Sequence, residues 1–341
     1  MLDLRAPIEF SQGAFSNATN IPLLTDKERE QIGTCYKQQG QEQAIELGHK
    51  IVSGEIKNQR MQAWKNYFQE NSKASLYCFR GGMRSHLVQQ WLKNEGIDVP
   101  LIEGGYKALR NYLLNVFEQP LNLIRISGQT GVGKTDLLVQ FEHMIDLEGL
   151  AHHRGSAFGK YVGVQPSQIN FDNNLAIEIL KKQESCSGSI IIEDESRYIG
   201  SINLPLAFID NMKKSPVIVL TCPQEERINR IYQDYVIKQK TDYINQYPED
   251  GSDLFDGSLL NALQKIRKRL GGVRYKQLNE TMQSALQQES ENLHKQWISD
   301  LLEYYYDPMY NYQLDKKSEL VVFRGDENEV REFLVSVKNE N

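Results

Sequence analysis

The strongest chemical signal in the sequence is a glycine-rich phosphate-binding loop at residues 128–135, which read Gly-Gln-Thr-Gly-Val-Gly-Lys-Thr. Glycines at this spacing let backbone N–H groups surround phosphate oxygens, and the N-terminus of the following helix adds positive potential. In this pattern the lysine reaches the terminal phosphates, and the threonine could hold a magnesium ion. The residues predicted to bind this di- or triphosphate are Gly128, Gly131, Val132, Gly133, Lys134 and Thr135.

Further polar residues could act on whatever this loop binds. Glu193 and Asp194 follow a run of isoleucines, the pattern of the acidic strand that helps P-loop proteins hold magnesium. Arg197 comes next, and it either pairs with these acids or faces a phosphate. A Gly-flanked stretch after the P-loop helix is either a substrate-contact loop or an ordinary capped turn, and its candidate contacts are His153, Arg154 and Ser156.

A second chemical signal is the loop at residues 78–85, which reads Cys-Phe-Arg-Gly-Gly-Met-Arg-Ser. A cysteine between a strand and a helix has successive backbone N–H groups pointing at its sulfur, which favours the thiolate. Such a thiolate is a nucleophile for sulfur, selenium or phosphorus centres. The catalytic residue predicted here is Cys78, in an anion-binding bowl formed by Arg80, Gly81, Gly82 and Arg84.

The other cysteines lack these surroundings. We predict that Cys35, Cys186 and Cys222 are buried and behave as small hydrophobic residues. Because the four cysteines are scattered and form no CxxC pair, the sequence predicts neither a disulfide framework nor a zinc site.

The elements that must position these loops alternate between strand and helix, which predicts an α/β fold. Strands are expected at Leu2–Arg5, Ala74–Phe79, Val99–Glu103, Leu121–Ser127, Ser189–Ile192 and Val217–Thr221, and helices at Arg84–Asn94, Gly105–Val116 and Lys134–Glu142. Residues 225–306 are expected to be mostly helical, with a loop at residues 245–256. Gln119-Pro120 interrupts the pattern, so we place a domain boundary near Glu118 and expect domains at 1–118 and 119–341.

Composition and charge narrow the class of protein. Hydrophobic residues make up 40% and charged residues 25%, which is ordinary for a soluble globular protein. No apolar run approaches the ~20 residues that cross a bilayer, and the chain does not start like a signal peptide. We therefore expect a cytoplasmic protein without membrane association.

The formal net charge of −6 does not by itself indicate a nucleic-acid partner, but one helical stretch is strongly basic. It is either a solvated helix face or a series of contacts to nucleic-acid phosphates. Its residues are Lys265, Arg267, Lys268, Arg269, Arg274 and Lys276, and the first five are the candidate contacts. The aromatic cluster at residues 304–312 could stack on bases, or it could pack in a helical core.

The first 110 or so residues resemble a rhodanese domain. Residues 3–10 are similar to its opening motif, residues 13–22 to its second motif, and Glu103-Gly104-Gly105-Tyr106 to its closing motif. The resemblance places Cys78 at the position of the rhodanese sulfur carrier. Five residues separate this cysteine from Arg84, as in phosphatase-like relatives, whereas common rhodaneses have four. A wider bowl suits a tetrahedral phosphate or a larger chalcogen.

A rhodanese domain followed directly by a P-loop domain resembles the tRNA 2-selenouridine synthase family over nearly the whole chain. The stretches that carry the resemblance outside the two loops are residues 33–40, 146–151, 153–159, 193–200, 305–310 and 321–325. The resemblance implies a rhodanese-like α/β domain and a P-loop NTPase-like α/β domain with a largely helical C-terminal part.

This resemblance also implies an activity. The family converts the wobble 2-thiouridine of certain tRNAs to 2-selenouridine, through an S-geranyl intermediate. The P-loop would then hold geranyl diphosphate, with magnesium as an aid, and Cys78 would take selenium from selenophosphate as an S-selanylcysteine intermediate. No tightly bound cofactor is expected. The resemblance also favours the interpretation of the basic helix as a tRNA contact.

Two other classes of protein stay open at this point. The five-residue spacing suits a cysteine phosphatase or sulfurtransferase fused to a kinase-like P-loop module. A nucleotide-switched carrier would instead read ATP or GTP with its P-loop. A GTPase is disfavoured, because the nearest match to its base-recognition sequence, Gln239-Lys240-Thr241-Asp242, has the wrong first residue.

Overall fold

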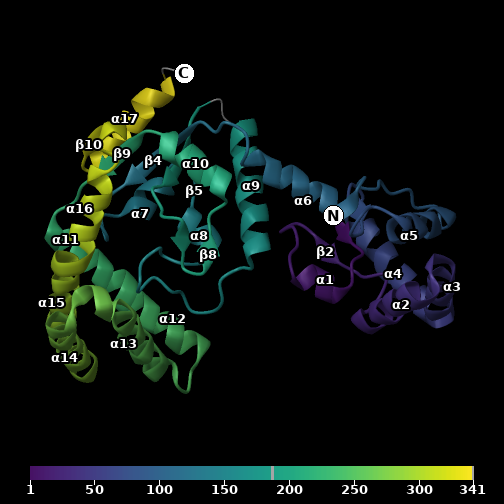
Figure 1. The fold of residues 1–341 in the computed structure, drawn as a ribbon, viewed down its shortest axis with the longest axis horizontal. Coiled ribbons are helices and arrows are strands. Elements are labelled where there is room, and N and C mark those ends of the chain that lie inside the picture. The colour runs from purple at the N-terminus through teal and green to yellow at the C-terminus, as the bar shows by residue number, and fades with distance from the viewer. Residues whose placement is uncertain (186–187, 340–341) are drawn as a thin grey trace. The chain divides into compact units, whose positions relative to one another are not determined.

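The computed structural model describes residues 1–185 and 188–339, so the prediction for Cys186 falls outside the described residues. The chain forms two compact units (Figure 1). One consists of Met1–Val116 and Ser167–Ala176, and the other of Phe117–Pro166 and Ile177–Asn341. The first unit ends at Val116, close to the domain boundary expected near Glu118. It also includes Ser167–Ala176, which follows after a gap of 50 residues in the chain.

A small parallel sheet forms the centre of the first unit. Its strand order is β2-β1-β3, with β1 at Leu2–Asp3, β2 at Thr19–Asn20 and β3 at Leu76–Tyr77. Apolar residues such as Leu4, Trp64 and Val88 pack around this sheet. The helices are α1 (Pro7–Ser11), α2 (Asp26–Gln39), α3 (Gln41–Ile51), α4 (Gly54–Glu70), α5 (Met83–Asn94) and α6 (Gly105–Val116).

The added segment, Ser167–Ala176, is held to the first unit by hydrogen bonds and an ion pair. It is the first half of α9 (Gln168–Ser185). The backbone N–H of Ala14 donates to Asn170 Oδ1 at 2.8 Å. Arg110 forms a salt bridge with Asp172 at 3.0 Å. These contacts explain why the segment groups with a unit from which it is distant in sequence.

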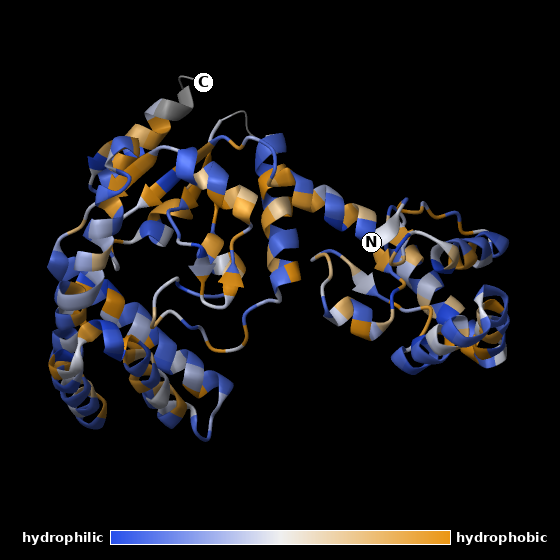
Figure 2. Cartoon of the chain, in the orientation of Figure 1, coloured by the Kyte–Doolittle hydropathy of each residue, from blue (hydrophilic) through white to orange (hydrophobic). Residues whose placement is uncertain are grey.

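A five-stranded parallel sheet forms the centre of the second unit. Its strand order is β10-β9-β4-β6-β5, with β4 (Leu123–Ser127), β5 (Met144–Ile145), β6 (Ile190–Glu193), β9 (Val217–Leu220) and β10 (Val321–Gly325). Figure 2 shows that these strands are largely hydrophobic, as expected for a sheet covered on both faces. A short antiparallel pair, β7 (Tyr198–Ile199) and β8 (Ile202–Asn203), follows β6.

Helices cover this sheet and then form a helical part with its own core. The helices near the sheet are α7 (Lys134–Leu138), α8 (Leu147–Ala151), α10 (Leu206–Lys214), α11 (Gln224–Ile231), α16 (Asp307–Asp315) and α17 (Glu327–Asn339). The helical part contains α12 (Gln239–Gln246), α13 (Gly251–Leu270), α14 (Gly272–Gln288) and α15 (Glu291–Leu301), with the π-helical turns η1 (Tyr232–Lys238) and η2 (Leu302–Tyr306), and the 3₁₀ turn η3 (Ser318–Leu320) precedes β10. The core of the helical part includes Phe255, Leu263 and Trp297.

The predicted α/β class with parallel sheets is confirmed, and several element predictions need correction. The loop expected at residues 245–256 is shorter than predicted and covers only residues 247–250, because α12 continues to Gln246 and α13 begins at Gly251. Burial of Phe255 in the helical core stabilises that early start. The strand expected at Val99–Glu103 is reduced to a single bridge between Leu76 and Leu101. The helix after the P-loop ends at Leu138, not at Glu142.

Candidate functional site

The P-loop lies between the central strand β4 and helix α7, where parallel α/β sheets bind their ligands. Gly131 and Gly133 have φ values of +83° and +88°, which only glycine adopts without strain. Space is also short, since a Cβ on Gly131 would lie 2.7 Å from Ile231 Cδ1. Lys134 Nζ donates a hydrogen bond to the Gly128 carbonyl at 3.2 Å. This hydrogen bond joins the end of the loop to its beginning, so the loop is closed and the lysine side chain lies across it.

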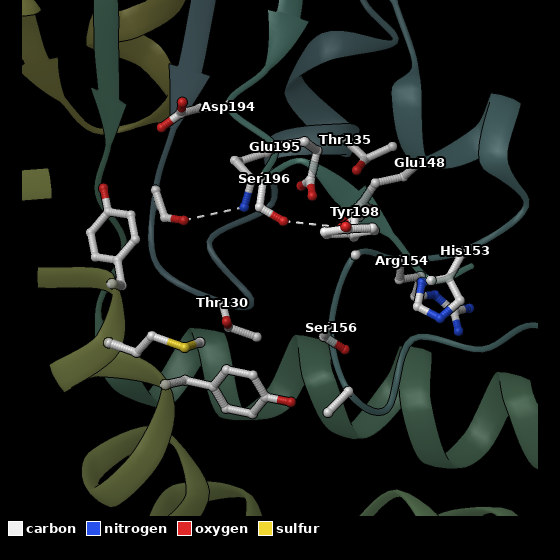
Figure 3. A pocket seen from close by; sticks show the side chains of 18 of the residues that line it. Thr130, Thr135, Glu148, His153, Arg154, Ser156, Asp194, Glu195, Ser196 and Tyr198 are labelled. Carbon is white, nitrogen blue, oxygen red and sulfur yellow. Dashed lines mark hydrogen bonds between the residues drawn. The ribbon is translucent and has the colours of Figure 1, made fainter. Parts of the chain in front are cut away.

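A large cavity opens beside this loop, with a volume of about 2060 Å³. Its walls come from the P-loop, the end of β6, helix α10, the 153–161 loop, helix α13 and both π-helical turns. π-Helical turns occur frequently at functional sites, and here η1 contributes Tyr235 while η2 contributes Tyr305 and Tyr306. Figure 3 shows side chains from several of these segments pointing into one space.

The acids predicted as magnesium ligands already have partners in the protein. The Glu193 side chain is fully buried, does not line the cavity, and accepts a hydrogen bond from the Leu147 N–H at 2.9 Å. Asp194 accepts from Ser127 Oγ at 2.7 Å and from Arg125 Nη1 at 2.8 Å, and it pairs with Lys317. Burial alone would raise the pKa of Asp194, but these partners lower it below its ordinary value.

Glu148 and Glu195, here called the acid pair, face the P-loop instead (Figure 3). A Cβ on Gly155 would lie 2.7 Å from Glu148 Oε1 and 2.8 Å from Glu195 Oε2, so the two carboxyl groups converge on one point. Burial and mutual repulsion raise the pKa of Glu148, and burial raises that of Glu195, although Lys134 counteracts both shifts. Two neighbouring carboxyl groups of this kind attract a cation.

A magnesium ion fits the groups on this side of the loop. Thr135 and the acid pair supply hard oxygen ligands, and a divalent cation would remove the repulsion between the two carboxylates. Within residues 1–185 and 188–339, no group of three or more His, Cys, Asp or Glu side chains has the arrangement of a metal site. Magnesium usually needs only one or two carboxylates, with water and substrate phosphates as the other ligands.

The predicted substrate-contact loop lies on the cavity wall. A bridge between His153 and Lys160 turns this loop, and the Arg154 N–H donates to the Gly159 carbonyl at 2.8 Å. The Arg154 guanidinium lies 4.2 Å from the centre of the Tyr161 ring and 5.0 Å from that of Tyr235. Burial and nearby cations lower the pKa of His153, so its ring is neutral at pH 7. His153, Arg154 and Ser156 all line the cavity.

The basic stretch predicted as one helix is split, because α13 ends at Leu270 and α14 begins at Gly272, so Arg274 lies on α14 and the other four candidate contacts lie on α13. Lys265 and Arg269 are one turn apart on α13, and both line the cavity. Arg267 lies over the ring of Tyr275, and Arg274 lies over that of Tyr304. Neither these two arginines nor Lys268 line the cavity.

Two further predictions about the cavity have mixed outcomes. Arg197 lines the cavity, which favours the ligand contact of its two alternatives, and its guanidinium lies over the ring of Tyr198. In the aromatic cluster at 304–312, Tyr305 and Tyr306 belong to the helical core, which favours the packing alternative for them.

Cys78 lies directly after β3, beneath the N-terminus of α5. Its Sγ is 3.3 Å from Ser85 Oγ, and its side chain is 3% exposed. Burial would raise the pKa of the thiol, but the Ser85 hydroxyl, Arg84 and backbone N–H groups lower it below its ordinary value. These groups therefore favour the thiolate relative to an ordinary cysteine, which is the direction that the sequence predicts.

The bowl around this sulfur is held by close backbone packing and an ion pair. Gly81 has a φ of +62°, and a Cβ on Gly105 would lie 2.2 Å from the Cys78 carbonyl oxygen. Arg84 Nη1 donates to Glu9 Oε2 at 2.8 Å, which fixes the guanidinium beside the bowl. Arg80 is exposed, and Gly82 precedes the first residue of α5.

The remaining cysteines differ from their prediction. Cys35 and Cys222 are partly exposed, where burial as small hydrophobic residues was expected. Cys35 lies on the polar helix α2, and Cys222 Sγ is 3.3 Å from Glu226 Oε2.

Comparisons with known proteins place the chain in a family. Residues 121–341 match the family described as the tRNA 2-selenouridine synthase AAA domain. The chain is 47% identical to tRNA 2-selenouridine synthase of Shewanella oneidensis, with 100% of this chain and 93% of the relative covered. It is 48% identical to tRNA 2-selenouridine synthase of Pseudomonas putida, with 98% and 94% covered. The chain belongs to this family. It is therefore an enzyme.

For this member of the tRNA 2-selenouridine synthase family, sequence reasoning missed four residues of the P-loop site. Glu148 had no local motif to mark it, and Glu195 was overlooked beside the two acids that precede it. Arg125 and Lys317, which neutralise Asp194, are 192 residues apart in sequence. A charged residue inside an otherwise apolar strand, as at Arg125, was the one available signal. The described helices include none that is long and apolar enough to cross a membrane.

Proposed function

We propose that this enzyme converts 2-thiouridine at the wobble position of tRNA to 2-selenouridine, through S-geranylation by geranyl diphosphate and replacement by selenium from selenophosphate. The observation that carries the first half is an apolar stripe beside the P-loop. Leu206, Ile209 and Met212 recur every three residues on α10 and line the same cavity as Lys134. Leu206 is 63% exposed. An isoprenoid chain attached to a diphosphate would cover this stripe, whereas ATP offers it nothing apolar of that length.

In the geranyl transfer, the uridine sulfur attacks C1 of the geranyl group. The C1–O bond breaks, its electron pair leaves with pyrophosphate, and the N3 proton of the base is released. Lys134 and the P-loop N–H groups stabilise the charge that develops on the departing pyrophosphate. Thr135 and the acid pair would hold magnesium, which supplies further charge neutralisation when bound. The closed loop keeps these donors in place before the reaction begins.

In the selenium step, the rhodanese-like unit provides Cys78 as the carrier. The thiolate attacks the selenium of selenophosphate, the Se–P bond breaks with its electron pair on phosphorus, and phosphite leaves, which gives Cys78–S–Se⁻. This selenium then attacks C2 of the S-geranyl base. The C2–S bond breaks, and the alkylated sulfur leaves as geranylthiol after protonation. A thiol reductant then cleaves the Cys78–S–Se bond, which releases the selenated base and leaves a mixed disulfide on Cys78. The lowered pKa of the thiol and the Arg84–Glu9 pair beside it support this role.

The test is mass analysis of nucleosides from thiolated tRNA treated with enzyme, geranyl diphosphate and selenophosphate, each omitted in turn. We expect Cys78→Ala to accumulate S-geranyl-2-thiouridine and to form no selenouridine, while Lys134→Ala forms neither product. Cys35→Ala is the matched cysteine control and should behave as wild type. If Cys78→Ala abolishes both products while the protein stays folded, the division of labour between the two units is refuted.

A second measurement separates this proposal from a cysteine phosphatase. The loop at residues 78–85 has the spacing of phosphatase-like relatives, so an aryl phosphate is the appropriate probe. We expect no Cys78-dependent hydrolysis of that probe. Mass analysis of the Cys78 peptide after selenophosphate alone should show an added selenium atom, and an added phosphoryl group would contradict the carrier chemistry.

A further inference from the structure

The cavity beside the P-loop carries more positive charge than a diphosphate needs. Across residues 1–185 and 188–339, the basic side chains that line it without forming a salt bridge are Lys134, Arg154, Lys160, Arg197, Lys265, Arg269 and Lys316. Three of the five acids in its wall are already neutralised, namely Asp136, Asp194 and Asp234. The remaining acids are the acid pair. The positive charge of these unpaired cations therefore suits an anionic ligand that is larger than the diphosphate.

Three of these cations, Arg154, Lys160 and Lys265, act on one buried histidine, and Arg269 lies one turn beyond Lys265 on α13; the group is called the His153 cluster. It consists of His153, Arg154, Lys160, Lys265 and Arg269. His153 is 9% exposed, and its Nδ1 has no hydrogen-bond partner in the described part of the chain. Arg154 Nη1 is likewise buried and unpartnered. Repulsion among such cations is unfavourable, and a bound anion would remove it.

The positions of these groups suggest a ligand with a phosphate and a base. Lys265 and Arg269 lie four residues apart on one face of α13, so both can reach the same anionic group. His153 is neutral and can donate to or accept from a base or a sugar hydroxyl. Tyr198 is 53% exposed at the cavity wall and offers a ring for stacking. Cavities for small ligands usually measure ~300–1,000 Å³, so this one has room for a nucleotide as well as the prenyl diphosphate.

We propose that the His153 cluster binds a backbone phosphate of the RNA substrate and thereby holds the reacting nucleotide in the cavity beside the P-loop. This inference rests on the proposed function, because it assumes that the anion belongs to RNA. Enzymes that modify a base take it out of its stack into a pocket, and single-stranded loops yield a base at least cost. Phosphate contacts fix the register of the strand, while the pocket contacts the base.

The experiment compares two double variants that remove the same charge. Lys265→Gln/Arg269→Gln removes two unpaired cations of the cluster. Lys181→Gln/Lys295→Gln removes two lysines that form salt bridges on their own helices and do not line the cavity. The probe is a fluorescent anticodon stem-loop RNA carrying 2-thiouridine, and its Kd is measured by anisotropy at several KCl concentrations. All four positions lie on helix surfaces, and circular dichroism confirms that each variant is folded.

The expected change follows from counterion release. Each lost contact to a single-stranded phosphate reduces the slope of log Kd against log salt by ~0.7, so the cluster variant should lose about 1.4 from this slope. Extrapolated from 1 M salt, that difference corresponds to about 25-fold weaker binding at 0.1 M KCl. The control variant should keep the wild-type slope. Equal losses in both variants, or an unchanged slope in the cluster variant, would overturn the proposal.

A second arm distinguishes RNA phosphate from the diphosphate and from free phosphate. The Kd for geranyl diphosphate, measured by calorimetry, should be the same in the cluster variant and in wild type. If it weakens as much as RNA binding, the cluster belongs to the diphosphate site and the proposal fails. Inorganic phosphate at millimolar concentration should not compete with the RNA probe more than chloride of equal ionic strength. If the cluster variant shows the predicted loss of slope but wild type transfers no geranyl group, the proposed function fails and the cluster assignment stands.

Discussion

Replacing Asp194 by asparagine tests how the acidic end of β6 divides its roles. The Asp194 side chain is 4% exposed, and Arg125, which it pairs with at 2.8 Å, is 7% exposed. Lys317 forms a second ion pair with the same carboxylate. An asparagine keeps the shape but leaves both cations without a counter-charge. Removing one partner of a buried ion pair costs about 3–5 kcal/mol.

This loss is large enough to measure by thermal unfolding. For a domain of 150–250 residues, 1 kcal/mol corresponds to a Tm shift of about 2–4 °C, so Asp194→Asn should lower Tm by about 6–20 °C. The pKa of Asp194 is lowered in the folded protein. Its stabilisation is therefore present above the pKa of the unfolded chain and is lost as pH falls through the folded pKa. The difference in Tm between wild type and variant should shrink in acid.

Glu195→Gln is the matched control, because it makes the same chemical change one residue later. Burial raises the pKa of Glu195, so an amide resembles its protonated form. We expect a stability change within about 0.5 kcal/mol, and weaker magnesium-dependent binding of geranyl diphosphate. Calorimetric melts and titrations on both variants give the two readouts. The reasoning is refuted if Glu195→Gln destabilises the protein while Asp194→Asn leaves Tm unchanged and abolishes magnesium-dependent binding.

Three further predictions concern other groups. Burial raises the pKa of Cys78, but the Ser85 hydroxyl and other groups outweigh it, so Ser85→Ala should move the midpoint of the iodoacetamide pH–rate profile upward. Burial lowers the pKa of His294 from 6.5 to about 4, so the unfolded chain binds its proton first. The urea midpoint of unfolding should therefore decrease as the pH is lowered from 6.5 to about 4, and His294→Gln should reduce that decrease. A Cβ on Gly155 would meet both members of the acid pair, so Gly155→Ala should weaken magnesium-dependent diphosphate binding, whereas Gly257→Ala, with open space around it, should not.

Local sequence patterns predicted those parts of the fold that depend on neighbours in sequence. Helix α6 has the predicted bounds Gly105–Val116, and α5 begins one residue before its prediction, because short-range periodicity determines both. The P-loop was predicted residue by residue from its glycine spacing. In contrast, strands such as β1 and β3 are only two residues long, because pairing across the sheet determines where a strand ends.

The division of roles at the end of β6 could not be predicted from the sequence. Successive side chains of a strand point to opposite sides, but a run of three acids does not reveal which of them meets a cation. That choice depends on Arg125 and on Lys317, which reaches Asp194 from the distant C-terminal part of the chain. The membership of Ser167–Ala176 in the first unit depends in the same way on Ala14 and Arg110.

The last strand of the sheet has a consequence for how the protein is made. β10 (Val321–Gly325) pairs with β9, yet about a hundred residues of chain are synthesised between them. Until the ribosome has delivered β10, the apolar strand β9 remains an open edge to which another nascent chain could add. Lys317, the counter-charge of Asp194, arrives equally late. Translation must therefore continue for about a hundred residues past β9 before this sheet is protected from aggregation.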